Sequence, residues 1–232
     1  MRRRGGFGFV PQLRPTAEQT FLRDQRLEGL TVYDVGTFEG IHSLFFSRAV
    51  GKGGRVVGFE PNPRSYRRAG ENLALNHATN VELLPIAVGD RSDTATLQYD
   101  PLDAGRGSIQ TPEAEGQTVR RTSVSVDVRP LDELVMSGRI PPPDFVKIDV
   151  EGAERAVLAG MEKTIRQHGP RLFIEVHGHD DAEKLATVRS ILARQATLGY
   201  RCRHVETGRD LDPSDTDLPI SGHLYCVPAS RS

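Results

Sequence analysis

The residues best suited to chemistry in this sequence are ionisable side chains at the ends of apolar runs that predict buried strands. Burying a charge is costly unless the charge is paired or serves a site. In a parallel sheet, the carboxyl ends of the strands lie along one edge, where ligands of open α/β sheets bind. The sequence therefore predicts one ligand site that gathers these side chains: Asp34, Glu60, Asp90, Asp149, Glu175 and His177.

The stretch from Thr31 to Gly40 predicts a strand, a glycine turn and the start of a helix that continues through residues 41–50. Glycines at 36 and 40 let a ligand approach the backbone, and the first turn of the helix can bind an anionic group. The spacing differs from the dinucleotide fingerprint because Phe38 stands where a second glycine is required. Asp34 would repel a pyrophosphate. A ligand with a cationic group fits this turn better.

Composition limits the classes of protein. The chain has 232 residues, 37% of them apolar, with 30 Lys and Arg against 31 Asp and Glu. We expect a flexible tail over residues 1–15 and a single domain over 16–232, with an insertion at about 90–130. The charge balance favours neither nucleic acid nor a membrane surface. With two cysteines and no long apolar run, we expect a cytoplasmic protein in which Cys202 and Cys226 are reduced core thiols.

Strand-like and helix-like segments alternate along the chain, which predicts an open α/β sheet with parallel strands. Asn62 followed by Pro63 marks a helix start. The insertion predicts a hairpin, from strands over 94–99 and 122–128, with a loop near 103–116. Strands are expected over 31–35, 55–59, 81–87, 144–150, 171–177, 200–206 and 222–227, and helices over 16–28, 41–50, 62–77, 153–167 and 181–198.

Several motifs together resemble the FkbM family of S-adenosylmethionine-dependent methyltransferases. They are Asp34-Val-Gly36, Phe59-Glu-Pro-Asn-Pro63, Asn72-Leu-Ala-Leu-Asn76, Ala87-Val-Gly89, Val146-Lys-Ile-Asp-Val-Glu-Gly-Ala-Glu154 and Glu175-Val-His177. The resemblance covers roughly residues 20–180. It implies a doubly wound, seven-stranded Rossmann-like class I methyltransferase sheet with a reversed final strand and helices on both faces. It also implies O-methylation with S-adenosyl-L-methionine as cofactor.

The resemblance also implies the cofactor contacts. Gly36 and Gly40 would border the methionyl part, with Asp34 meeting its ammonium directly or through water, and Glu60 would accept both ribose hydroxyls. Ala87 and Val88 would lie at the adenine edge. The first turn departs from the family, because Thr37-Phe38-Glu39 replaces Ala-Asn-x and places a charge where the family has none. The expected cofactor-binding residues are Asp34, Gly36, Thr37, Phe38, Gly40, Glu60, Pro61, Asn62, Ala87, Val88 and Asp149.

Methyl transfer to a hydroxyl needs an aligned acceptor and a group that removes its proton. His177 is the first candidate for this base, because an imidazole titrates near neutral pH. Asp149 is expected to position the acceptor. A carboxylate pressed against a sulfonium would stabilise the ground state more than the transition state. We expect Lys147 and Glu175 either to form an ion pair across adjacent strands or to contact the substrate.

Glu151 and Glu154 fit the first turn of the following helix, where negative charge meets the helix dipole. His177-Gly-His179-Asp180-Asp181 permits a metal site, but such a run more often forms a loop and a helix cap, so we expect none. Two other functions stay open. They are an NAD(P)-dependent oxidoreductase on the same architecture and a non-catalytic binding module. The expected partner is a small-molecule hydroxyl acceptor, and the sequence predicts no oligomeric state.

Overall fold

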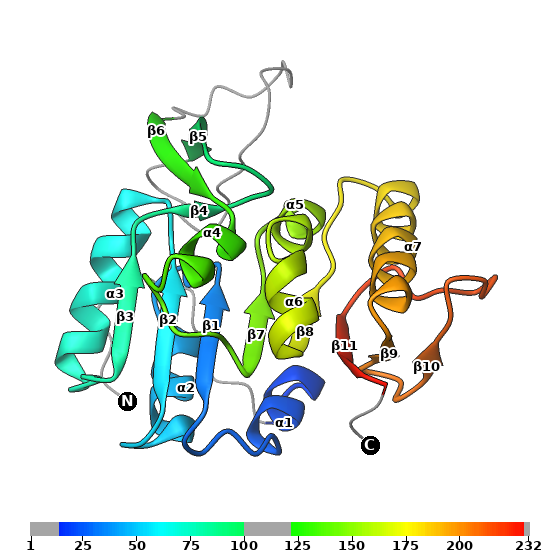
Figure 1. Cartoon of the computed structure of the whole chain (residues 1–232), viewed down its shortest axis with the longest axis horizontal. Coiled ribbons are helices and arrows are strands. Elements are labelled where there is room, and N and C mark those ends of the chain that lie inside the picture. The colour runs from blue at the N-terminus through cyan, green and yellow to red at the C-terminus, as the bar shows by residue number, and fades with distance from the viewer. Residues whose placement is uncertain (1–13, 100–121, 230–232) are drawn as a thin grey trace.

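The computed structural model describes residues 14–99 and 122–229 of the chain. They form an α/β fold with a main sheet of eight strands and a second sheet of three (Figure 1). In spatial order the main sheet consists of β10 (Asp210–Leu211), β9 (Tyr200–His204), β11 (His223–Pro228), β8 (Arg171–Glu175), β7 (Phe145–Ile148), β1 (Thr31–Val35), β2 (Arg55–Phe59) and β3 (Val81–Leu84).

The parallel strands are those that the sequence pattern predicts, and the strand order is the one that the family resemblance implies. Strands β3, β2, β1, β7 and β8 pair in parallel, and β11 runs antiparallel to both of its neighbours. This reversed strand and the doubly wound order confirm the class I methyltransferase architecture. The main sheet has one strand beyond the expected seven, the two-residue β10 at its edge.

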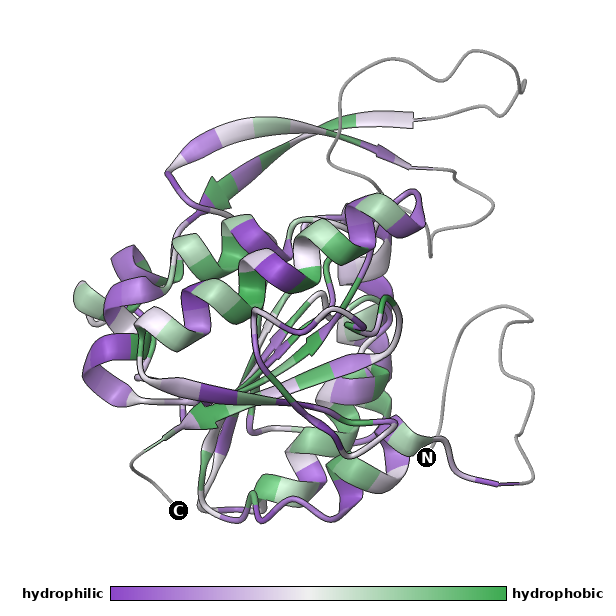
Figure 2. Ribbon diagram, turned by 90° about the vertical axis from the view of Figure 1, so that its right-hand side faces the viewer, coloured by the Kyte–Doolittle hydropathy of each residue, from purple (hydrophilic) through white to green (hydrophobic). Residues whose placement is uncertain are grey.

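Helices lie on both faces of the main sheet (Figure 2). The side chains of each strand alternate between the two faces. Val32 and Phe145 pack with α1 and α2, whereas Tyr33 and Val146 pack with α4 to α7. The helices are α1 (Ala17–Arg23), α2 (Ile41–Val50), α3 (Pro63–Leu75), α4 (Leu131–Met136), α5 (Glu154–Ala159), α6 (Glu162–His168) and α7 (Asp181–Thr197).

Helix boundaries follow local chemistry. Asn62 caps α3 as predicted, since its side chain accepts hydrogen bonds from the N–H groups of Arg64 and Ser65. The single helix expected over 153–167 is instead divided into α5 and α6 near Gly160. A Cβ atom at Gly160 would lie 1.9 Å from the carbonyl oxygen of Gly89, so the chain turns where only glycine fits. The short helix α4 was not predicted.

The second sheet contains the predicted hairpin. Strands β5 (Asp93–Tyr99) and β6 (Thr122–Arg129) pair antiparallel and project from the main body (Figures 1 and 2), and β4 (Ala87–Val88) pairs with the base of β6. The strand expected over 81–87 therefore ends at Leu84, and its last residue belongs to this other sheet. The expected loop near 103–116 and most of the expected tail over 1–15 lie outside the described residues.

The prediction of reduced thiols is wrong for this structure. Cys202 and Cys226 are directly opposed on the antiparallel strands β9 and β11, and they form a disulfide with their Cα atoms 4.1 Å apart. Both residues are buried in the late strands, as expected. The pairing depends on strand register, which the spacing of two cysteines does not reveal. Among the described residues, no helix is long and apolar enough to cross a membrane.

Candidate functional site

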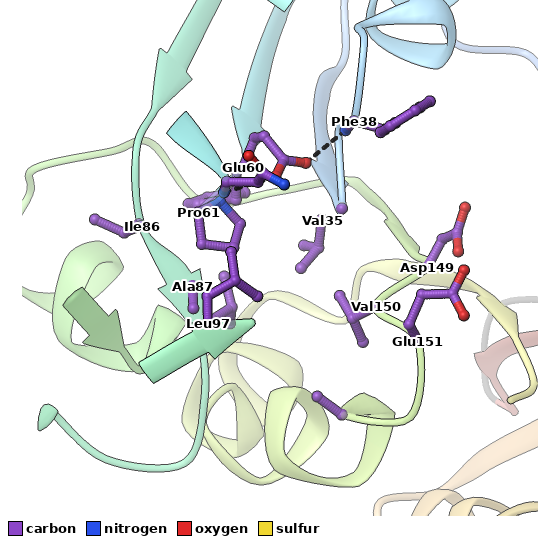
Figure 3. Close-up of a pocket in the computed structure, with 15 residues that line it drawn as sticks. Val35, Phe38, Glu60, Pro61, Ile86, Ala87, Leu97, Asp149, Val150 and Glu151 are labelled. Carbon is purple, nitrogen blue, oxygen red and sulfur yellow. Dashed lines mark hydrogen bonds between the residues drawn. The ribbon is translucent and has the colours of Figure 1, made fainter. Parts of the chain in front are cut away.

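A pocket lies at the carboxyl ends of β1, β2 and β7, the edge at which the sequence predicts a ligand site. Figure 3 shows Ala87 and Leu97 at one side and the carboxylates of Asp149 and Glu151 at the other, with Glu60 above the centre. Of the expected cofactor-binding residues, eight line this pocket: Gly36, Phe38, Glu60, Pro61, Asn62, Ala87, Val88 and Asp149.

The turn after β1 holds the pocket together. Gly36 has φ +87°, and a Cβ atom there would lie 1.7 Å from the carbonyl oxygen of Asp149. Glycine is therefore required both by the left-handed backbone and by the close approach of the β7 end. The N–H groups of Gly36 and Thr37 both donate to the carbonyl of Phe59, at 3.1 Å each. The ends of β1, β2 and β7 are thereby fixed against one another.

Glu60 is buried at the end of β2 with both carboxylate oxygens occupied. Oε2 accepts the backbone N–H of Phe38 at 2.7 Å, and Oε1 accepts that of Asn62 at 2.8 Å. Phe38 has a φ of 50°, which is uncommon for a residue with a side chain. Burial raises the pKa of Glu60 to about 7, against the lowering effect of the two N–H donors and with a further rise from the charges of Asp34 and Asp149.

Three expected cofactor contacts lie outside the lining of the pocket. Asp34 is fully buried in β1, where Oδ2 accepts the hydroxyl of Ser43 at 2.6 Å and Oδ1 has no hydrogen-bond partner among the described residues. The hydroxyl of Thr37 donates to the carbonyl of Asp34 at 2.9 Å, and Gly40 packs against Ala69. These residues stabilise the turn through buried contacts and do not line the pocket.

Glu39 carries the charge in the turn that differs from the family pattern, and its side chain does not point into the pocket. Glu39 is buried and pairs with Arg68 of α3 at 2.6 Å, and its carbonyl accepts the side-chain amide of Asn72 at 2.9 Å. The turn is thus attached to α3. Phe38 alone of the three substituted positions borders the pocket.

Lys147 is fully buried in β7 and pairs with Asp149, with Nζ 2.8 Å from Oδ2. Burial would lower the pKa of Lys147, but the charges of Asp149 and Asp34 outweigh it and raise that pKa above its ordinary value. Of the two roles that the sequence left open for Lys147 and Glu175, the ion pair between them is absent from the described residues, because Lys147 pairs with Asp149 on its own strand. Lys147 therefore holds one oxygen of Asp149 and leaves the other toward the pocket edge.

His177 lies beyond the end of β8 among four carboxylates. Its Nδ1 is 2.8 Å from Oε1 of Glu154, and its Nε2 is 3.7 Å from Asp149, 3.7 Å from Glu175 and 4.0 Å from Glu151. Burial would lower the pKa of His177, but the bond to Glu154 and the charges of Glu151 and Glu175 raise it to about 9. The imidazole therefore does not titrate near neutral pH as the sequence suggested.

Sequence reasoning missed three residues of this region. Glu151 and Glu154 were assigned only to a helix start. Glu154 does begin α5 and accepts the N–H of Gly152 at 3.0 Å, but it also binds His177. Leu97 reaches the pocket from the inserted hairpin. The repeated acidic spacing of Asp149, Glu151 and Glu154 was the available signal for the first two.

Comparisons with known proteins agree with this geometry. The model of the methyltransferase FkbM domain matches residues 34–202. The hexuronic acid methyltransferase AglP of Haloferax volcanii is 29% identical over 169 residues, which cover 73% of this chain and 65% of AglP. The 2-O-methyltransferase NoeI of Sinorhizobium fredii is 28% identical over 146 residues, 58% of each chain. The chain thus spans less than two thirds of the length of these relatives.

The fold also matches solved structures. The crystal structure of methyltransferase FkbM from Methylobacillus flagellatus superposes with a TM-score of 0.55 at 21% identity, over 88% of this chain and 45% of that one. Other methyltransferases of similar fold were solved with S-adenosylmethionine or S-adenosylhomocysteine. These likenesses establish the architecture.

We predict that Gly36→Ala destabilises the protein by about 2 kcal/mol or more, because the added Cβ clashes with Asp149 and the backbone is left-handed. Gly70→Ala is the matched control. Gly70 lies exposed in α3 with open space around it, so alanine there should stabilise by roughly 0.5–1 kcal/mol. Urea denaturation measures both. Equal unfolding midpoints for Gly36→Ala and wild type would contradict the close approach of β1 to β7.

Proposed function

Because the chain belongs to the FkbM methyltransferase family, we propose that it transfers the methyl group of S-adenosyl-L-methionine to a hydroxyl of a small-molecule or sugar-containing metabolite. The observation that carries this proposal is that Glu60, Asp149 and the turn at Gly36 all line one pocket. The hexuronic acid and 2-O-methyltransferase relatives favour a sugar hydroxyl as acceptor.

The residues of the pocket fit the cofactor. Glu60 presents a carboxylate that can accept both ribose hydroxyls, while Ala87 and Val88 supply a backbone edge and apolar surface for adenine. The unpartnered Oδ1 of Asp34 suits an ammonium group that it meets through water, since buried polar atoms are normally hydrogen-bonded. Thr37 and Gly40 support this arrangement from behind by packing the turn. When bound, the cofactor supplies an electrophilic methyl group.

The acceptor enters at the Asp149 edge in this proposal. During transfer, the acceptor O–H bond breaks as a new O–C bond forms, so a proton must leave the hydroxyl. In this proposal Asp149 and His177 contact the acceptor. Lys147 holds Asp149 through their ion pair, and Glu175 faces the imidazole of His177 at 3.7 Å. Alignment of the hydroxyl can contribute several kcal/mol to lowering the barrier.

The two alternative functions have weaker support. The turn after β1 argues against an NAD(P)-dependent oxidoreductase, because Phe38 stands where the dinucleotide fingerprint requires a glycine and Asp34 would repel a pyrophosphate. The non-catalytic module was suggested by Thr37-Phe38-Glu39, but Glu39 adds no charge to the pocket because it pairs with Arg68. Calorimetric titration distinguishes the methyltransferase from the oxidoreductase, because we expect S-adenosylhomocysteine to bind and NADH not to bind.

We predict that His177→Ala lowers turnover by roughly 10²-fold, because the acceptor is then less well aligned, and leaves affinity for S-adenosylhomocysteine within about twofold of wild type. His177 acts on the acceptor and does not line the cofactor pocket. His179→Ala is the matched control, since His179 is exposed two residues away and should retain full activity. The assay measures transfer of a radiolabelled methyl group to a panel of hexuronic acids and neutral sugars. Undiminished turnover of His177→Ala would remove His177 from the mechanism.

We predict that S-adenosylhomocysteine binds about tenfold more tightly at pH 8 than at pH 6. The pKa of Glu60 is about 7 in the free protein, and the ribose hydroxyls favour its charged form. Affinity should therefore rise with pH through neutrality and level off above it. Titration calorimetry across this range measures the slope, and Glu60→Gln, which cannot ionise, should flatten it. An equal slope in that variant would assign the effect to another group.

A further inference from the structure

The side chain of His177 has the surroundings of a metal ligand. Its Nε2 faces three carboxylate oxygens, Oδ1 of Asp149 and Oε1 of Glu175 at 3.7 Å and Oε2 of Glu151 at 4.0 Å. One oxygen or nitrogen from each of Asp149, Glu151 and His177 lies within 4.8 Å of the others. The residues come from separate positions: the end of β7, the turn after it and the end of β8.

These separations are close to those of ligands around one cation. Metal–ligand distances near 2.1 Å place neighbouring ligand atoms about 3.0 Å apart and opposite ones about 4.2 Å apart. The distances from Nε2 lie between these two values. None of them is as short as a hydrogen bond, and the three ion pairs that they form with the protonated imidazole would be replaced by bonds to the cation. Small rotations of the side chains are sufficient.

The orientation of the imidazole supports a ligand role. The fully buried Glu154 binds Nδ1, so Nε2 is the ring nitrogen that faces the three carboxylates, and it can bind a cation when that cation displaces the Nε2 proton. Metal-binding histidines commonly donate their other N–H to a carboxylate in this way. Glu154 also accepts the N–H of Gly152, next to Glu151, so the same buried group holds both the imidazole and the turn that carries Glu151.

The two carboxylate oxygens of Asp149 have different partners. Oδ2 pairs with Lys147, whereas Oδ1 turns toward His177. Four carboxylates therefore gather around one imidazole; Lys147 pairs with Asp149, and His223 lies 3.7 Å from Oε2 of Glu175 on the side away from His177. Imidazole and carboxylate donors together suit Mn²⁺ and related divalent ions.

We propose that Asp149, Glu151 and His177 bind one divalent cation at the edge of the cofactor pocket, with Glu175 as a fourth ligand. The sequence suggested no metal, because the run from His177 to Asp181 was the only set considered. His179 and Asp180 of that run are exposed, and Asp180 caps α7. The cation joins His177 instead to residues more than twenty positions earlier in the chain.

The role of the cation rests on the proposed methyl transfer, whereas its binding does not. A cation at this edge can hold two neighbouring oxygens of the acceptor, which selects vicinal diols and hydroxy acids. A hydroxyl bound to it loses its proton more readily. The O–H bond breaks with release of the proton to water, the O–CH₃ bond forms and the C–S bond of the sulfonium breaks. His177 is then a ligand and not itself the base.

Titration of the metal-free full chain with Mn²⁺ alone tests the proposal. We expect one Mn²⁺ per chain by calorimetry, with nitrogen coupling in the pulsed electron paramagnetic resonance spectrum. His177→Ala should abolish that coupling and weaken binding at least tenfold, and Glu154→Gln should weaken it roughly 10–100-fold. His179→Ala and Asp181→Asn, both exposed and outside the cluster, should bind as wild type does.

Glu151→Asn gives a variant that keeps the backbone of the turn. Glu151 has a φ of 52°, which asparagine tolerates, so this variant should fold while losing a ligand. Circular dichroism and thermal unfolding confirm folding of each variant. Binding of Mn²⁺ by folded Glu151→Asn and His177→Ala with wild-type affinity and nitrogen coupling would overturn the proposal, as would the absence of Mn²⁺ binding by wild type.

The outcomes also separate this inference from the proposed function. Undiminished methyl transfer by protein that has been stripped with EDTA, together with no bound Mn²⁺, refutes the cation and leaves the methyltransferase intact. Site-specific Mn²⁺ binding without any affinity for S-adenosylhomocysteine supports the cation and refutes the cofactor proposal.

Discussion

The structure of the site depends on the close approach between the end of β1 and the end of β7. Gly36 leaves room for the carbonyl oxygen of Asp149, and the N–H of Asp149 donates to the carbonyl of Val35 at 3.0 Å. Any side chain at position 36 would separate these strand ends. Because the same turn is also bonded to Phe59 of β2, the contact brings Glu60 and Asp149 to one pocket although they are distant in the sequence.

A second constraint is the buried charge beside that contact. Lys147 is fully enclosed, and the register places it opposite Asp34 on the neighbouring strand. A buried ammonium is costly unless carboxylates compensate it, and here Asp149 provides the direct partner. Replacing either member alone would leave an uncompensated charge. The ion pair therefore fixes Asp149 in one orientation, which determines the oxygen that faces the cluster around His177.

The sequence predicted the sheet and the strand-end acids because both follow from short-range patterns. Alternation of apolar residues locates β1 and β7, and a parallel arrangement brings Glu60 and Asp149 to the same edge. The partner of His177 was not predictable in this way. Its contact with Glu154 depends on the path of the turn at Glu151 and Gly152, which no periodicity encodes. The Cys202–Cys226 disulfide likewise depends on the register of two antiparallel strands.

Two turns that border the pocket have the same structure: each contains a residue with positive φ and is held by a buried carboxylate. Three of the described residues other than glycine have a positive φ. Two of these, Phe38 and Glu151, line the pocket. Each strained turn is held by a buried carboxylate that accepts one of its N–H groups, Glu60 at Phe38 and Glu154 at Gly152. Such strain persists only when the surroundings determine the conformation. The buried carboxylates of Glu60 and Glu154 thus determine the shape of the two turns that border the pocket.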